Sequence, residues 1–510
     1  MHIFLYGPVG AGKSTVGKIL ALNLDLPFVD SDQVIEAKAG QSIFEMMTQQ
    51  GERACRDLET AVLKEIVTDP ESVIALGGGA LLREENRALV ENNGKVIFLV
   101  AGLETLFGRL HADSNKRPLL AGDLREKLTF LLAKRKEHYD SFPLRFDADQ
   151  APEKIAWQIQ VALGRFLLSA MGHYDVIVQN NGIGDLGEAL RLRGLQSPFV
   201  ITDENVAKLQ ADRVLTSLKK SGFDARMISV PPGEEHKNLD TVSALWKSFL
   251  SHGLDRKSTV LALGGGVIGD LAGFAASTYM RGIHWVAVPT TLLSMVDASL
   301  GGKTGFDLPE GKNLIGSFHP PKLVLADPQV LRTLPEAEFI SGLAEVVKHG
   351  IIADPDLFDI CGQGLDCVKE DLERIVKRAM AVKIKIIEDD PYEKGFRAAL
   401  NLGHTVGHAV ELVSGFELRH GEAISIGMVI EATYAETIGI AHKGLADVIK
   451  NTLSKLELPV RIPNGLPRQE IIRAMRVDKK KNASAIRFAL PAEIGRVELV
   501  EVTGLEKVLE

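Results

Sequence analysis

The chain has 510 residues, of which 45% are hydrophobic and 25% charged, so we expect more than one domain and large buried cores. A formal net charge of -8 argues against nucleic acid as a partner. The three cysteines, Cys55, Cys361 and Cys367, are too few for a disulfide framework and too scattered for a thiolate zinc site. We see no apolar run that could span a membrane, and a glycine-rich loop from residue 7 leaves no room for a signal peptide. We therefore expect a cytoplasmic enzyme that acts on small molecules.

The first motif follows an apolar run at residues 3–6, which predicts a buried strand. It reads Gly7-Pro8-Val9-Gly10-Ala11-Gly12-Lys13-Ser14, the G-x-x-x-x-G-K-S pattern of a nucleotide-binding loop. The glycines let the backbone wrap closely around phosphates, Lys13 neutralises the β and γ oxygens, and Ser14 coordinates Mg²⁺. Apolar runs at 72–76 and 95–100 predict further parallel strands. The loop therefore predicts a kinase or another nucleotide-binding domain.

Charged and glycine clusters behind this loop indicate a substrate site. Asp30-Ser31-Asp32 closes an apolar run, so one carboxylate can serve Mg²⁺ and the other a substrate hydroxyl. A triple glycine at 77–79 follows the strand at 72–76 and allows close backbone approach. Arg117 follows a polar stretch at 111–116, as it would in a lid. With Arg56 and Arg135 these residues form an ordered set, although each arginine alone could be an ordinary surface residue.

Residues 1–165 resemble shikimate kinase, whose motifs occur here in order: the loop, D-x-D, G-E-x-x-F-R-x-x-E, GGG, RPLL and R-x-x-x-Y. The resemblance implies that ATP with Mg²⁺ is bound by Gly10, Gly12, Lys13, Ser14, Thr15 and Arg109, with Arg117 above the phosphates. It implies that shikimate is held by Asp32, Arg56, Gly78, Gly79 and Arg135, and that Asp32 accepts the proton of the 3-hydroxyl. Two departures from the pattern, Cys55 before Arg56 and Pro143 after the tyrosine motif, touch no catalytic position.

The chain then changes character. Residues 153–170 predict a helix, and the pattern resets at 171–173, where we place a boundary. Strand-like runs at 174–178, 199–202, 260–263 and 285–288 predict an open α/β sheet, whereas spacing from about residue 330 is helical, as at 372–387 and 424–440. The predicted fold class is α/β, with a P-loop α/β/α domain at 1–165, a Rossmann-like α/β lobe at 172–328 and a mostly α-helical metal-binding lobe at 329–510.

A second glycine turn follows the strand at 260–263. The run Gly264-Gly265-Gly266-Val267-Ile268-Gly269-Asp270 is a weak signal by itself. Loop-like segments at 232–237 and 289–293 strengthen it, because a glycine turn with nearby carboxylates indicates ribose and pyrophosphate recognition. We therefore expect a dinucleotide in this lobe.

The later part contains the ligand set of a metal site. His404 and His408 share a helix face at i, i+4, Glu345 lies upstream and His420 follows. One carboxylate and two histidines with open positions are typical of catalytic zinc. The spacing leaves open whether His408 or His420 completes the set. Basic residues, among them Arg281, Lys303, Lys348, Lys383, Arg397 and a lysine run at 479–481, indicate an anionic substrate, although several could be solvated surface lysines.

Residues 172–510 resemble 3-dehydroquinate synthase through specific strings, among them GGGVIGDLAGF, PTTLL-x-x-VDAS, AE-x-x-K-x-G, GHT-x-GHA-x-E and HGEA. The resemblance implies a homodimer, Zn²⁺ or Co²⁺ on Glu345, His404 and His420, and catalytic roles for Lys348, Glu393 and His408. It implies NAD contacts by Asp203, Asn205, Glu234, Lys237, Gly265, Gly266, Val267, Asp270, Thr290, Thr291, Lys312 and Thr333. It implies that the substrate is held by Arg281, which would reach across a dimer interface, and by Asp297, Lys303, Asn313, Lys348, Lys383, Arg397, Asn401, His408 and Lys480.

The sequence thus predicts a bifunctional shikimate-pathway enzyme of aromatic amino acid biosynthesis. The first part would phosphorylate the shikimate 3-hydroxyl, and the second would convert 3-deoxy-D-arabino-heptulosonate 7-phosphate to 3-dehydroquinate with loss of phosphate. These steps are not consecutive in the pathway, so we expect no channelling. The alternatives are a nucleotide-binding regulatory module for the first part, and a metal-dependent polyol dehydrogenase or another sugar-phosphate cyclase for the second.

Overall fold

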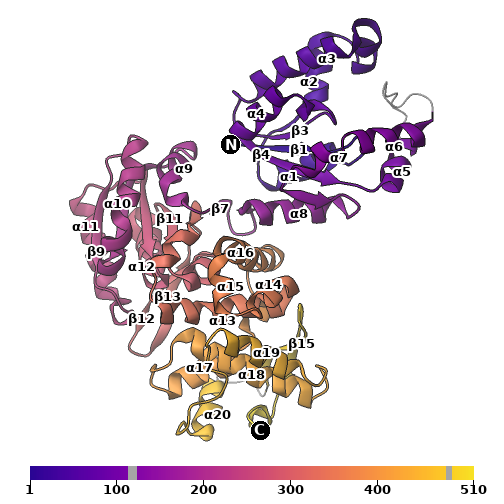
Figure 1. Cartoon of the computed structure of the whole chain (residues 1–510). Coiled ribbons are helices and arrows are strands. Elements are labelled where there is room, and N and C mark those ends of the chain that lie inside the picture. Colours follow the sequence, from indigo (N-terminus) through magenta and orange to yellow (C-terminus); the bar gives the residue numbers. More distant parts are fainter. Residues whose placement is uncertain (113–122, 478–484) are drawn as a thin grey trace. The chain divides into compact units, whose positions relative to one another are not determined.

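The computed structural model describes residues 1–112, 123–477 and 485–510, the side chain of residue 477 excepted. The chain divides into two compact units, Met1–Leu167 and Leu168–Glu510 (Figure 1). We call them the first and the second unit. The division falls slightly before the boundary expected at 171–173, and the finer three-part division stays a prediction. No helix in the described residues has the length and apolar character needed to cross a membrane.

The first unit alternates short strands with helices. Its strands form one parallel sheet in the order β2-β3-β1-β4-β5. The elements are β1 (His2–Tyr6), α1 (Lys13–Asn23), β2 (Phe28–Asp30), α2 (Ser31–Ala39), α3 (Ile43–Ile66), β3 (Val73–Ala75), η1 (Ala80–Leu82), α4 (Glu84–Asn93), β4 (Gly94–Val100), α5 (Leu103–Ala112), α6 (Leu124–Lys134), α7 (Lys136–Asp140), β5 (Arg145–Asp147) and α8 (Pro152–Leu163).

Strand residues in the first unit alternate between two cores. Ile3 and Leu5 of β1 pack in a core with residues of α1, α5 and α8. Phe4 and Tyr6 point to the opposite face and pack with residues of α3, α4 and α7. This period of two gives the sheet a helical layer on each side, as expected for an α/β/α domain, and brings the carboxyl ends of β1, β2 and β3 to one edge (Figure 1).

The helix expected over 153–170 is wrong in its second half. Helix α8 ends at Leu163 because Gly164 adopts a left-handed conformation (φ 67°) and closes the helix. Residues Arg165–Leu168 then form strand β6, which spans the division between the units and is counted at the edge of the larger sheet. The apolar residues of this stretch therefore alternate along a strand.

The second unit is built on a seven-stranded sheet in the order β6-β7-β14-β11-β10-β8-β9, and its five neighbouring pairs from β7 to β9 are parallel. Its first elements are β7 (Tyr174–Val178), η3 (Gly182–Asp185), α9 (Leu186–Leu192), β8 (Gln196–Asp203), α10 (Glu204–Lys220), β9 (Arg226–Val230), η4 (Glu234–His236), α11 (Leu239–Ser251), β10 (Ser258–Gly264), α12 (Gly266–Thr278), η5 (Tyr279–Arg281), β11 (His284–Pro289), η6 (Ser294–Ala298), β12 (Lys303–Leu308), β13 (Gly311–Phe318), β14 (Leu323–Ala326) and η7 (Pro328–Thr333).

A mostly helical lobe follows, as predicted, and ends in a hairpin that the helical spacing did not indicate. Its core joins α17, α18 and α20 to the hairpin. The elements are α13 (Glu336–Ala353), α14 (Pro355–Cys361), α15 (Leu365–Glu370), α16 (Leu372–Asp389), η8 (Phe396–Asn401), α17 (His404–Val413), α18 (His420–Thr437), α19 (Leu445–Lys455), α20 (Arg468–Val477), β15 (Ile486–Glu493), β16 (Arg496–Val502) and η9 (Leu505–Val508).

Candidate active sites

The phosphate-type loop of the first unit lies between β1 and α1. Gly10 (φ 81°) and Gly12 (φ 90°) take left-handed conformations that only glycine adopts without strain. The ammonium of Lys13 donates to the carbonyl oxygens of Gly7 and Pro8, each at 3.0 Å, so the loop holds its own lysine in place. The Ser14 hydroxyl donates to Asp30 Oδ2 at 2.7 Å. Loop, hydroxyl and carboxylate are thus arranged as a nucleotide with Mg²⁺ requires.

A cavity of about 1090 Å³ opens beside this loop. Nearly every residue predicted for the kinase site lines it: Gly10, Gly12, Lys13, Ser14, Thr15, Asp32, Arg56, Gly78, Gly79, Arg109 and Arg135. The volume is enough for a nucleotide and a second small molecule together. Arg117 lies outside the described residues. The tertiary structure therefore unites residues that the sequence separates by more than 120 positions.

Arg56 is fixed by a buried carboxylate. Its Nη1 donates to Glu59 Oε2 at 2.8 Å, one helical turn further along α3. Burial raises the pKa of Glu59, and the charge and hydrogen bond of Arg56 offset part of that rise. Gly79 lies directly against the guanidinium, since a Cβ at residue 79 would be 2.5 Å from Arg56 Nη2. The arginine is thus held at the glycine loop, facing the cavity.

Arg135 contacts the neighbouring glycine of the same loop. Its Nη1 donates to the Gly78 carbonyl oxygen at 2.9 Å and to the Tyr139 hydroxyl at 3.2 Å. Tyr139 donates to the same carbonyl at 2.9 Å. Arg109 lies beside the phosphate-type loop: its Nη1 contacts the Ala11 carbonyl oxygen at 3.4 Å, and its Nη2 donates to the Ala148 carbonyl oxygen at 2.8 Å. The predicted substrate arginines and the predicted adenine-side arginine therefore lie at separate places around the cavity.

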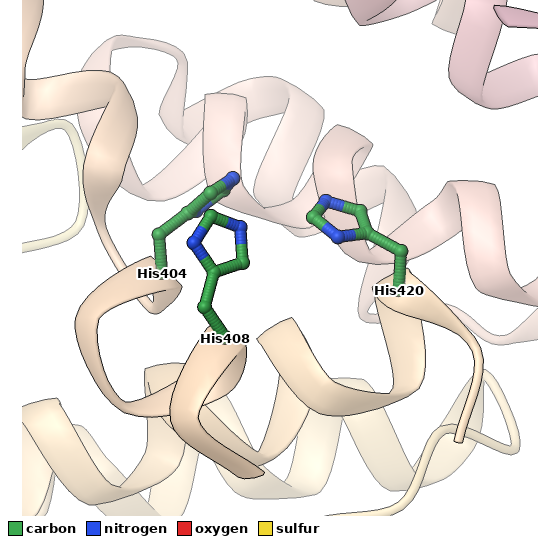
Figure 2. A group of neighbouring side chains, drawn as sticks. All are labelled: His404, His408 and His420. Carbon is green, nitrogen blue, oxygen red and sulfur yellow. The ribbon is translucent and has the colours of Figure 1, made fainter. Parts of the chain in front are cut away.

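The second unit gathers three histidines (Figure 2). His404 and His408 project from α17, and His420 projects from the first residue of α18. One ring nitrogen of each lies within 4.8 Å of the others. The ring centroids of His408 lie 5.0 Å from His404 and 5.6 Å from His420. The choice between His408 and His420 therefore stays open on geometry.

Glu345 of α13 completes this group. Its Oε1 lies 3.7 Å from His404 Nε2 and 3.8 Å from His420 Nε2. The carboxylate is fully buried and pairs with the ammonium of Lys348. Burial would raise the pKa of Glu345, but Lys348 and the two histidines hold it well below the ordinary value. A buried, ionised carboxylate facing two imidazole nitrogens fits a divalent cation.

The two imidazoles differ in charge. Burial and Lys348 lower the pKa of His404 well below its usual range, which leaves a neutral ring. Burial also acts to lower the pKa of His420, but Glu345 and Glu411 outweigh it and raise this pKa to about 9. The cluster of carboxylates and imidazole rings thus attracts a cation, which can be either a proton or a metal ion.

Two carboxylates outside the predicted set support the histidines. Glu431, fully buried on α18, accepts the backbone N–H of Gly403 at 2.5 Å and of Val406 at 3.3 Å, and so fixes the first turn of α17. Glu411 accepts from His420 Nδ1 at 3.3 Å. The GHA-x-E string contained Glu411, but helical spacing could not indicate which ring it reaches.

A second set of possible metal ligands consists of Asp297, Glu345 and His349, and so shares Glu345 with the histidine group. Lysines neutralise it: Lys383 Nζ lies 2.5 Å from Asp297 Oδ1, and Lys348 pairs with Glu345. Burial would raise the pKa of Asp297, but Lys383 outweighs it and brings the pKa to about 2. The predicted substrate lysines 348 and 383 are thus held by carboxylates beside the histidine group.

The residues predicted to contact a dinucleotide surround the turn between β10 and α12. Lys237 Nζ lies 2.6 Å from both Asp270 Oδ2 and Asn313 Oδ1, which links the glycine turn to β13. Gly265 is the N-cap of α12, and Gly266 and Val267 are its first two residues. Other residues of this predicted set make local hydrogen bonds: Asp203 caps α10, the Thr291 hydroxyl accepts from the Ser294 N–H, and the Thr333 hydroxyl accepts from Gln210. The buried Thr290 hydroxyl has no hydrogen-bond partner among the described residues.

The remaining predicted substrate residues are only partly united. Glu393 pairs with Lys303 and lies 3.4 Å from the buried Arg397 Nε. The side chains of Arg281 and Asn401 make no hydrogen bond or ion pair within residues 1–112, 123–477 and 485–510. Arg281 has a left-handed backbone (φ 71°) in the exposed turn after α12. Lys480 lies outside the described residues.

Comparisons with known proteins divide the chain in the same way. Residues 9–163 match the shikimate kinase family, residues 227–341 the N-terminal region of 3-dehydroquinate synthase, and residues 342–481 its C-terminal region. The 3-dehydroquinate synthase of Crocosphaera subtropica is 43% identical over 336 residues, which are 64% of this chain and 92% of that protein.

Two solved structures are similar to the second part. A 2-deoxy-scyllo-inosose synthase complexed with carbaglucose-6-phosphate, NAD⁺ and Co²⁺ is 25% identical, with a TM-score of 0.62 over 68% of this chain and 99% of its own. The 2-epi-5-epi-valiolone synthase of Streptomyces hygroscopicus, with NAD⁺ and Zn²⁺ bound, is 28% identical, with a TM-score of 0.61 over 66% and 94%.

Proposed function

Because the chain belongs to the 3-dehydroquinate synthase family and carries a shikimate kinase domain ahead of it, we propose that its two candidate sites catalyse two separate shikimate-pathway reactions. The first unit transfers a phosphoryl group from ATP to the shikimate 3-hydroxyl. The second converts 3-deoxy-D-arabino-heptulosonate 7-phosphate to 3-dehydroquinate and releases phosphate. The observation that carries this proposal is the pairing of each expected binding loop with a separate set of charged and metal-ligating side chains.

In the kinase site, positioning and charge neutralisation supply most of the catalysis. Lys13 and the loop N–H groups face the phosphates, and Ser14 with Asp30 holds Mg²⁺. Arg56 and Arg135, at the glycine loop, bind the shikimate carboxylate. A Cβ at Gly77 would be 2.7 Å from Asp32 Oδ1, so this carboxylate lies against the loop, where it can accept the hydroxyl proton. Arg117 is assigned to the phosphates by resemblance alone.

In the synthase site, we assign Glu345, His404 and His420 to the metal, and the residues around the β10–α12 turn to NAD. When bound, NAD accepts and returns a hydride and the divalent metal polarises substrate hydroxyls. Lys348, Lys383, Arg397 and Lys303 neutralise the anionic substrate. His408, the third ring of the group, is placed to serve the departing phosphate. Glu393, between Lys303 and Arg397, is the second candidate for moving a proton.

We also propose that the protein is a cytoplasmic homodimer joined through the second unit. Arg281 lies in an exposed turn and makes no polar contact within the described part of its own chain. An arginine held in such a turn suits an anion bound by a partner subunit. The apolar side chains of Met280, Leu314 and Phe318 are exposed in the same turn and on β13, which supports an interface there.

Two parallel assays on the full chain test the proposed function. We expect phosphate release from the heptulosonate phosphate, its loss with a chelator and its return with Zn²⁺, without accumulation of NADH. We also expect shikimate-dependent ADP formation. His404→Ala should lower only phosphate release and Lys13→Ala only ADP formation, each by about 100-fold or more. Each variant is therefore the control for the other.

The outcomes separate the alternatives. Sustained NADH formation would identify a dehydrogenase in the second unit, and phosphate release only from a different seven-carbon phosphate would identify another cyclase. ADP formation at a rate that does not depend on shikimate would overturn the assignment of the first unit, and the assignment of the second unit would stand.

A further inference from the structure

Glu411 connects two parts of the second unit that the proposed function assigns to different ligands. Its carboxylate is largely buried on α17. Oε2 accepts from His420 Nδ1 at 3.3 Å, and Oε1 lies 3.2 Å from the ammonium of Lys312 on β13. One carboxylate therefore contacts both a predicted metal ligand and a predicted NAD contact.

The contact between Glu411 and His420 determines the tautomer and the orientation of the imidazole ring. A hydrogen bond from Nδ1–H to a carboxylate leaves Nε2 without its proton in the neutral ring, and Nε2 is the atom that faces Glu345 at 3.8 Å. Carboxylates placed behind metal-bound histidines fix their tautomer and orientation in this way. Removing the Glu411 charge should therefore weaken metal binding even though Glu411 does not touch the metal.

The contact with Lys312 extends the connection to the glycine turn. The Lys312 ammonium also lies 4.4 Å from the centre of the Phe416 ring, so it is held on two sides. The next residue, Asn313, accepts from Lys237, and Lys237 pairs with Asp270 in α12. Two series of polar contacts thus meet at neighbouring residues of β13: one runs from Asp270 through Lys237 to Asn313, and the other from Lys312 through Glu411 to His420.

We propose that Glu411 is a positioning residue that couples metal binding to NAD binding in the second unit. The inference rests on the proposed function, which supplies the two ligands. A metal that orders His420 also orders Glu411 and with it Lys312, so the protein loses less conformational freedom when NAD then binds. Coupling of this kind is reciprocal, so NAD must raise metal affinity by the same factor by which metal raises NAD affinity.

Binding measurements on the metal-stripped full chain test this coupling without any turnover. Co²⁺ affinity is measured from its visible absorption with and without NAD, and NAD affinity by calorimetry with and without Co²⁺. In the unsubstituted protein we expect each ligand to tighten the other by about tenfold. Glu411→Gln should weaken Co²⁺ binding by about 10- to 100-fold and abolish the coupling.

Lys312→Met separates coupling from metal binding. It leaves Glu411 on His420, so Co²⁺ affinity without NAD should stay within about twofold of the unsubstituted protein while the coupling factor falls to about one. The factor is a ratio, so a direct effect of this lysine on NAD affinity cancels. Glu417→Gln and Lys443→Met, on exposed residues of the same unit, are the matched controls and should retain the coupling.

Two results would overturn the inference while the proposed function stands: ligands that bind independently in the unsubstituted protein, or coupling that persists in Lys312→Met. A normal Co²⁺ affinity in Glu411→Gln would also overturn it. A protein that binds neither Co²⁺ nor NAD would instead contradict the proposed function itself.

Discussion

At the scale of single residues, the candidate sites depend on side chains held by neighbours that the motifs do not name. Arg56 belongs to a recognisable string, but the ion pair with buried Glu59 and the contact with Gly79 fix where its guanidinium points. The same holds for His420, which is oriented by Glu411. The resemblance to the two families indicated the arginine and the histidine, whereas the orienting contacts depend on how helices pack.

Gly79→Ala tests this placement of Arg56. The backbone at Gly79 (φ -123°) accepts alanine without strain, but the new Cβ would be 2.5 Å from Arg56 Nη2, so the flexible guanidinium must move away. We expect a folded protein whose KM for shikimate rises about tenfold, equivalent to about 1.4 kcal/mol, while its KM for ATP is unchanged. Steady-state kinetics with each substrate varied in turn measures both.

Gly108→Ala is the matched control, because nothing lies within 4 Å of a Cβ at this helical glycine. It should leave both KM values unchanged and stabilise α5 by up to about 1 kcal/mol. An unchanged KM for shikimate in Gly79→Ala would argue that Arg56 does not bind the substrate.

At the scale of elements, clear apolar runs form strands where we expect them. The elements that differ from the prediction do so for identifiable reasons. The strands at 174–178, 260–263 and 285–288 lie within β7, β10 and β11. The helix expected to extend to residue 170 ends before Gly164, which caps it. This glycine is visible in the sequence, but the helical spacing of the apolar residues around it favoured a longer helix. The hairpin β15–β16 pairs two runs whose alternation is masked by additional apolar residues.

The junction after α8 is stabilised by an ion pair that should make the first unit sensitive to acid. Arg165 donates to both oxygens of Glu71, at 2.5 and 3.2 Å. Burial acts to raise the pKa of Glu71, but Arg165 outweighs it and lowers the pKa below the ordinary value. A depressed pKa stabilises the folded state above the pKa of the unfolded chain, and this contribution is lost as pH falls through the folded value.

Glu71→Gln should therefore lower the free energy of unfolding of the first unit by about 1 kcal/mol at pH 7, and the difference should shrink as pH falls below the ordinary glutamate pKa and through the depressed folded value. Urea unfolding at a series of pH values measures it. Glu137→Gln, at an exposed glutamate without an ion pair among the described residues, should show no such pH dependence. A difference that stays constant down to pH 3 would assign the effect to packing and not to charge.

At the scale of the whole molecule, each unit has its own cores and its own candidate site. We expect two transitions in scanning calorimetry, each shifted by one set of ligands. Shikimate with a non-hydrolysable ATP analogue should raise only one Tm, and Zn²⁺ with NAD only the other. A ligand at 100 times its Kd adds about 2.7 kcal/mol, which shifts Tm by roughly 8 °C for the first unit and by roughly 4 °C for the larger second unit. A shift of both transitions by either set would show that the units are energetically coupled.

The sequence by itself determined the type of chemistry in each part, because phosphate loops, metal ligands and glycine turns require particular residues at short spacings that a chain shows directly. It also determined most parallel strands, since buried strands are continuous apolar runs. Only the tertiary structure decided that Arg56, Arg135 and Asp32 line one cavity, and that Glu411 joins His420 to Lys312. Such contacts link residues far apart along the chain, and their geometry is set by how sheets and helices pack, which no local spacing encodes.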